Sequence, residues 1–517
     1  MRKPILLLAA VALGTAACSS SGYSASYPAY GGATAAPDHH LATQPPYDPY
    51  EPEQPPATPY DGVTYQDPGV NPYVPADRDR ESTFALDVDT ASYAIAQRYV
   101  MDGNLPDPAS VRAEEFVNAF DQDYAAPTDG TFAISSDGGP SPFLDEGEVL
   151  LRIGVQAREI TRLQRPDAAL TFVIDTSGSM AREDRLGLVK QALTFLVDRL
   201  RPRDSVAIVA FGTDAQVILE PTSAQDADRI LSAIDSLQPS GSTNAEAGLR
   251  LGYQLASDAL REGGINRVIL ASDGVANLGN TDPESILARV RPDAEQGVQL
   301  VTVGFGMGNY NDVLMEQLAD KGDGFYAYVN QLDDARTLFG EQLTSTLDTV
   351  ALDAKAQVEF NPDVVEAYRL VGYENRAVPD SEFRNDEVNA GAIGAGHAST
   401  ALYALRLTGE RGGIFDSGRL ATVHLRWTDP DSRQAQEVAG DVHLDDLAGT
   451  FAETEPTFQL DAIVAAAAER FRQSRWAAGY DLTDVAAVAD EAAAGLPRTD
   501  EVHALLAMLD EAGRLER

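Results

Sequence analysis

Oxygen-bearing side chains at three alternate positions follow one strand-like run of the sequence. The run from Leu170 to Ile174 is apolar or β-branched throughout, which is typical of a parallel strand buried on both faces. It ends at Asp175, and Ser177 and Ser179 follow at alternate positions, with Gly178 between them to let the backbone turn. A carboxylate and two hydroxyls at the end of a strand are hard oxygen ligands, which suit Mg²⁺ or Mn²⁺.

Two later stretches could lie beside this loop. Residues 241–244 read Gly-Ser-Thr-Asn and precede an amphipathic helix, while residues 268–274 form a second apolar run that ends in an acid and a glycine. In a doubly wound sheet, ligand loops lie at the carboxyl ends of the strands, where these stretches are expected. The alternative is that all three are ordinary strand-end caps and turns.

The order of the three stretches resembles the von Willebrand factor type A domain with its metal-ion-dependent adhesion site. The resemblance implies that a divalent cation, Mg²⁺ or Mn²⁺, is held directly or through water by Asp175, Ser177, Ser179, Thr243 and Asp273. It also implies that one coordination position stays open for an Asp or Glu of a partner protein. A metal with few anionic ligands remains electrophilic enough to attract that carboxylate.

Residues 168–345 alternate between apolar strands and amphipathic helices, as expected for a type A domain. One helix carries its apolar residues on a single face, namely Leu186, Val189, Ala192, Leu193, Leu196 and Val197. Strands are predicted at 205–211, 216–219, 298–303 and 325–329. This alternation predicts a Rossmann-like, doubly wound, mostly parallel α/β sheet in three layers.

The flanks of this domain have β patterns. Short strand-like runs occur in residues 131–167 and again in residues 346–450, where Gly, Pro and Asn separate them. We expect the two groups to pair in an antiparallel β-sandwich, so that the type A domain is inserted in it or flanked by it. Residues 451–517 are Ala-rich and predicted to be helical. Together with an N-terminal segment at 81–130, they resemble a family of bacterial lipoproteins that carry a type A domain.

The N-terminus has the features of an export signal. Two basic residues, a short apolar run and a set of small residues precede Cys18, the only cysteine, so we predict a signal peptide over residues 1–18. The small residues resemble a lipoprotein box, which implies that Cys18 is lipidated; the alternative is an ordinary cleaved signal with a stray thiol. Residues 19–80 are rich in Pro and Tyr and are predicted to form a disordered tether, with docking of the tyrosines as the alternative. Because Ser19 follows the cysteine, we expect a cell-envelope protein anchored to the outer membrane and facing the periplasm, with the inner membrane as the alternative.

Charge and histidine content limit the possible functions. The chain has 39 basic and 80 acidic residues, a net charge of −41, which argues against nucleic acid as a partner. The expected ordered part of the chain contains only four histidines, and none lies in a nucleophile or zinc motif: His397, His424, His443 and His503. We therefore expect no enzymatic activity. Two alternatives to a metal-dependent binding protein remain: a scaffold whose metal is structural, and a metal-dependent hydrolase.

Overall fold

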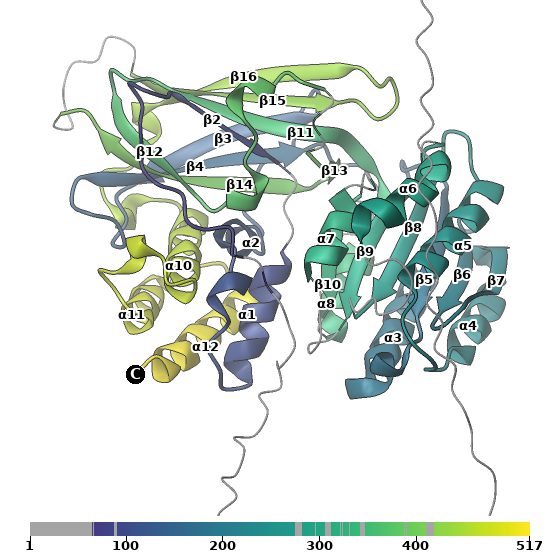
Figure 1. Ribbon diagram of the computed structural model, residues 1–517. Coiled ribbons are helices and arrows are strands. Elements are labelled where there is room, and N and C mark those ends of the chain that lie inside the picture. Colours follow the sequence, from purple (N-terminus) through teal and green to yellow (C-terminus); the bar gives the residue numbers. More distant parts are fainter. Residues whose placement is uncertain are drawn as a thin grey trace, which may run out of the picture. The chain divides into compact units, whose positions relative to one another are not determined.

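The described part of the chain builds three β-sheets, two of which form a sandwich and one of which is the centre of an α/β domain (Figure 1). The computed structural model describes residues 65, 67–86, 90–273, 282–294, 296–305, 312–320, 322, 324–329, 331–341, 347–386, 388, 390–409 and 418–517. The signal peptide, the lipidation site and most of the predicted tether lie outside these residues.

The sheet of the α/β domain is parallel except at one edge. Its strands lie in the order β10 (Tyr326–Val329), β9 (Gln299–Phe305), β8 (Ile265–Ser272), β5 (Ala168–Asp175), β6 (Ser205–Phe211) and β7 (Ala215–Ser223). Only the pairing of β6 with β7 is antiparallel. Along β5, Leu170 and Phe172 enter the core on one face and Val173 enters the core on the other. The strand is therefore buried on both faces, as its unbroken apolar run predicts.

Helices cover both faces of this sheet. One face packs on α3 (Arg185–Val197), α4 (Ala227–Ser236) and α8 (Leu332–Arg336), and the other on α5 (Ala245–Asp258), α6 (Pro283–Ala294) and α7 (Asp312–Asp320). The six apolar positions predicted for one helix face are all buried in α3. The predicted three-layer, doubly wound α/β fold is thereby confirmed.

The sandwich consists of two antiparallel sheets with a shared apolar core. The first sheet has the order β1 (Val74–Pro75), β12 (Val365–Val371), β14 (Ala398–Leu407), β4 (Glu148–Ala157) and β3 (Phe132–Gly139). In the second, β13 (Ala392–Gly394), β11 (Thr349–Phe360), β15 (Arg419–Thr428) and β16 (Ala435–His443) follow one another, and β2 (Glu81–Ala85) pairs with β11. Because β4 pairs with β14, strands from before and after the α/β domain complete one sheet, as predicted.

The predicted tether is wrong at its C-terminal end. Val74 and Pro75 form β1 and pair with β12, although they fall within residues 19–80. Tyr73 donates a hydrogen bond of 2.7 Å to Glu148, and its ring lies edge-on to Trp476 with 5.1 Å between the ring centroids. Proline is tolerated at a sheet edge, so a Pro/Tyr-rich composition did not exclude this short strand.

Helices from both ends of the chain share one apolar core against the first sheet of the sandwich. They are α1 (Ala91–Met101), α2 (Ala113–Val117), α10 (Pro456–Phe471), α11 (Leu482–Ala492) and α12 (Asp500–Leu515). Leu150, Val371 and Leu402 extend from the sheet into this core. The predicted helical region is therefore confirmed, and it includes the helices of the N-terminal segment.

A buried arginine joins this helical layer to the sheet. Arg152 of β4 contacts Asp137 of β3 through two hydrogen bonds of 2.7 and 2.6 Å. The same guanidinium donates to Asp461 of α10 at 2.9 Å and to Gln122 at 3.1 Å. Asp461 is fully buried and accepts hydrogen bonds from Arg152 and from the side-chain amide of Gln122, so it depends on these two donors for compensation.

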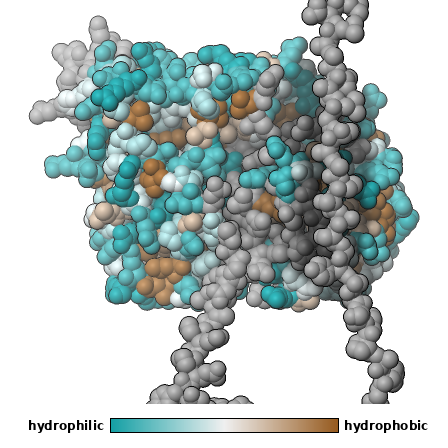
Figure 2. Space-filling view, in the orientation of Figure 1, coloured by the Kyte–Doolittle hydropathy of each residue, from teal (hydrophilic) through white to brown (hydrophobic). Residues whose placement is uncertain are grey.

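One face of the described structure is mostly hydrophilic (Figure 2). On the face shown in Figure 2, hydrophilic residues predominate and hydrophobic residues form only small, separate groups. None of the helices in the described ranges combines the length and the hydropathy that crossing a lipid bilayer requires.

Candidate metal centre

Asp175 lies at the carboxyl end of β5 with both carboxylate oxygens hydrogen-bonded. The backbone N–H of Ser177 donates to Oδ1 at 2.8 Å, and the hydroxyl of Ser272, the last residue of β8, donates to Oδ2 at 2.7 Å. Asp175 is fully buried. The adjacency of β5 and β8 therefore fixes the orientation of this carboxylate.

The pKa of Asp175 shows that its charge is poorly solvated. The pKa of Asp175 is raised to about 6: burial is the main cause and the nearby charge of Asp273 adds to it, while the hydrogen bonds from Ser272 and Ser177 oppose the shift. A cation between the two carboxylates would offset the cost of ionising Asp175 at neutral pH.

The two predicted serine ligands lie next to each other. The hydroxyl oxygens of Ser177 and Ser179 are 2.9 Å apart, within hydrogen-bond distance. Ser179 belongs to the 3₁₀ turn η2 (Gly178–Asp184), which connects β5 to α3. This turn keeps both hydroxyls at the end of the strand, where Asp175 lies.

The Gly-Ser-Thr-Asn loop contacts this turn through its backbone. The N–H of Gly178 donates to the carbonyl of Gly241 at 3.0 Å. Gly241 has a φ of +80°, and a Cβ there would lie 2.7 Å from Oγ1 of Thr213, so only glycine fits. Asn244 caps α5, its side chain accepting from the N–H of Ala247 at 3.1 Å. Thr243 lies between Gly241 and Asn244 in the sequence, and its side chain is buried.

Asp273 follows β8 directly and is paired with an arginine. Its Oδ2 accepts a hydrogen bond of 2.6 Å from the guanidinium of Arg185, and both side chains are buried. Its Oδ1 is also buried and has no hydrogen-bond partner among the residues that the structure describes. A buried carboxylate oxygen without a partner is unusual, and a bound cation would satisfy it.

The donor set fits a hard divalent cation. It combines two carboxylates with hydroxyls, and the described ranges contain no cluster of three or more His, Cys, Asp or Glu side chains that could hold a metal. Mg²⁺ typically takes only one or two carboxylates and completes its shell with water. The residues that could hold it are the five named from the sequence, Asp175, Ser177, Ser179, Thr243 and Asp273, and their role as ligands stays a prediction.

Two further residues at this centre were missing from the sequence prediction. Ser272 precedes the predicted ligand Asp273, but its bond to Asp175 depends on the neighbouring strand. Arg185 begins α3, and its sequence position gives no sign that its charge is buried.

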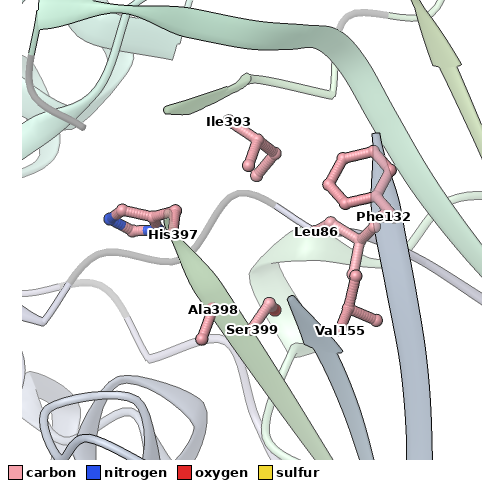
Figure 3. A pocket seen from close by; sticks show the side chains of 7 residues that line it. All are labelled: Leu86, Phe132, Val155, Ile393, His397, Ala398 and Ser399. Carbon is pink, nitrogen blue, oxygen red and sulfur yellow. The ribbon is translucent and has the colours of Figure 1, made fainter. Parts of the chain in front are cut away.

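A second feature is a small apolar pocket in the sandwich, lined by Leu86, Phe132, Val155, Ile393, His397, Ala398 and Ser399 (Figure 3). The imidazole of His397 points away from the other labelled side chains. Burial lowers the pKa of His397, which favours a neutral ring. The hydroxyl of Ser399 lies 3.4 Å from that of Tyr373 instead. The pocket therefore does not combine a nucleophile with a base.

Comparisons with protein families cover most of the chain. Residues 169–341 match the model of the von Willebrand factor type A domain, and residues 345–515 match a model described as the C-terminal region of the uncharacterized protein YfbK. Residues 60–152 match a model described as von Willebrand factor. The resemblance inferred from the ligand loops is thus confirmed at the level of the domain.

Individual relatives span different parts of the chain. The uncharacterized protein YfbK of Escherichia coli (strain K12) is 39% identical over 396 residues, covering 72% of this chain and 69% of that protein. Inter-alpha-trypsin inhibitor heavy chain H4 of Homo sapiens is 30% identical over 174 residues, or 32% of this chain and 18% of that protein. The solved von Willebrand factor type A protein from Catenulispora acidiphila is 16% identical, with 76% and 98% of the two chains covered and a TM-score of 0.42.

The similarity to YfbK extends through both the type A domain and the C-terminal region. The chain therefore belongs to the family of von Willebrand factor type A domain proteins that includes YfbK of Escherichia coli.

Proposed function

We propose that this protein is a lipid-anchored protein of the cell envelope whose type A domain binds Mg²⁺ or Mn²⁺ and captures an acidic side chain of a partner protein. Type A domains commonly mediate protein–protein interactions. The observation that carries the proposal is the meeting of two buried carboxylates with the hydroxyl pair of Ser177 and Ser179 at one edge of the sheet.

The residues of the centre have distinct roles in this proposal. Asp175 and Asp273 supply negative charge, and the three hydroxyl side chains supply neutral oxygens that leave the site short of anionic ligands. The bound cation would act as a Lewis acid toward a carboxylate from outside. Ser272 and the N–H of Ser177 hold Asp175 in place, so little rearrangement is needed on binding.

A binding role is favoured over an enzymatic one because residues 168–345 contain neither histidine nor cysteine. Among the residues that the structure describes, Ser177 and Ser272 donate hydrogen bonds to Asp175, and Arg185 donates to Asp273.

The direct test is a titration of the full-length protein with Mn²⁺. Binding is measured as the decrease in the electron paramagnetic resonance signal of free Mn²⁺. The acidic surface will bind some Mn²⁺ non-specifically. The titration is therefore carried out at physiological ionic strength, where interactions between exposed charges are screened beyond about 8 Å. We expect one site per chain above this background. Partner capture from envelope extract should disappear in EDTA and return with Mg²⁺. Equal capture in EDTA would assign the metal a structural role only.

Anchoring is tested separately at Cys18, which lies outside the described residues. Replacing Cys18 with serine should move the protein to the soluble fraction or leave an uncleaved precursor, because serine cannot take the thioether-linked lipid. Intact mass spectrometry of the membrane fraction should show the mass of the lipid on the wild type. An unmodified Cys18, or a mature chain beginning at another residue, would contradict the anchor.

A further inference from the structure

A buried arginine lies within the candidate metal centre. Arg185 is the first residue of α3 and follows the turn that carries Ser179, so the same segment supplies a ligand and a cation. Its side chain is 3% exposed, and its guanidinium donates to Oδ2 of Asp273 at 2.6 Å. An arginine in this position carries a positive charge into the space where the metal charge would lie.

Without a metal, the ion pair between Arg185 and Asp273 balances part of the buried negative charge of the centre. The two acids of the centre, Asp175 and Asp273, are both fully buried. Buried charges are costly unless they are paired, and the guanidinium pairs one of the two carboxylates.

A divalent cation would meet this guanidinium as a competitor. Both need Asp273, and two positive charges in a buried site repel each other strongly. We propose that Arg185 is an internal counter-ion that stabilises the metal-free centre through Asp273 and weakens its affinity for the divalent cation. This inference rests on the proposed metal-binding function and extends it to the control of affinity.

The test compares Arg185→Met with Arg182→Met in the full-length protein. Both changes remove one positive charge from the same turn-and-helix segment, but Arg182 is exposed. We expect Arg185→Met to bind Mn²⁺ roughly tenfold more tightly than the wild type, since a nearby elementary charge no longer opposes the ion. Arg182→Met should leave the affinity unchanged within about twofold, because exposed charges are screened.

Stability gives a second readout that does not depend on partner binding. In EDTA, Arg185→Met should lower the melting temperature of the type A domain by several degrees in scanning calorimetry, because Asp273 loses its buried partner. Mn²⁺ should raise it back to the wild-type value or above. Arg182→Met should melt like the wild type in both conditions.

A second variant covers the case in which Arg185→Met does not fold. Arg185→Gln keeps a hydrogen-bond donor for Asp273 without the charge, so it should fold and show the same gain in Mn²⁺ affinity. If the wild type binds Mn²⁺ and a folded Arg185 variant binds it equally well or more weakly, the proposed role of Arg185 is wrong. The proposed metal-binding function is not affected by that result. If neither wild type nor variant binds Mn²⁺ above the Asp175→Ala background, both this inference and the proposed function fail.

Discussion

Replacing Asp175 with alanine should abolish Mn²⁺ binding and the cation-dependent capture of the partner. We expect the Mn²⁺ affinity to fall by more than about 100-fold, because losing a residue that merely supports a metal ligand already costs 10–100-fold. Titration with Mn²⁺ at physiological ionic strength measures this loss. Treatment of the wild type with EDTA should reproduce it, and Mg²⁺ should rescue the wild type but not the variant.

Stability separates this loss of binding from a loss of fold. Because the pKa of Asp175 is raised to about 6, mainly by burial, folding opposes ionisation, and the cost is present at pH values above 6. The variant Asp175→Asn removes that cost and keeps one acceptor for Ser272 or Ser177. In EDTA at neutral pH, it should therefore melt at or above the wild-type temperature.

Matched changes define the specificity of this result. Asp214→Asn removes an exposed charge from the neighbouring loop after β6 and should leave Mn²⁺ binding unchanged. Thr243→Ala should weaken binding more mildly than Asp175→Ala, since water can replace a neutral hydroxyl. Unfolding of Asp175→Ala, together with full partner capture by the wild type in EDTA, would favour a scaffold with a structural metal.

Replacing Arg152 with methionine should destabilise the sandwich and its helical layer. We expect this loss of stability to be larger than that of any other substitution proposed for this protein. The substitution leaves Asp461 fully buried without its cation and removes two hydrogen bonds from Asp137. Breaking one partner of a buried ion pair typically costs about 3–5 kcal/mol. Both tryptophans of the chain, Trp427 in β15 and Trp476 near α10, lie in this part, so tryptophan fluorescence in denaturant reports on it selectively.

An exposed ion pair is the control for Arg152. Arg384 contacts Glu437 at 2.7 Å, but its side chain is 60% exposed. Arg384→Met should cost less than about 1 kcal/mol, because exposed pairs contribute little. Similar losses for both variants would mean that Arg152 is no more important than a surface charge, which would contradict the ionic link between β4 and α10.

Local patterns predicted most of the α/β domain. The apolar run before Asp175 required a strand buried on both faces, and β6 occupies the predicted range 205–211. The antiparallel sandwich was predictable from the β patterns on both flanks. In contrast, β16 was not predicted as a strand, because most of its side chains are exposed and it lacks an apolar pattern.

The sequence by itself determined which residues end the strands of the α/β domain, and hence the oxygen donors of the candidate centre. Strand burial and turn chemistry depend on neighbouring residues, so Asp175, Ser177 and Ser179 could be recognised locally. Only the tertiary structure decided the pairing of Arg185 with Asp273, which are 88 positions apart. It likewise decided the joining of α1 and α2 with the C-terminal helices. Such contacts depend on strand order and on the burial of charge, which a linear pattern does not encode.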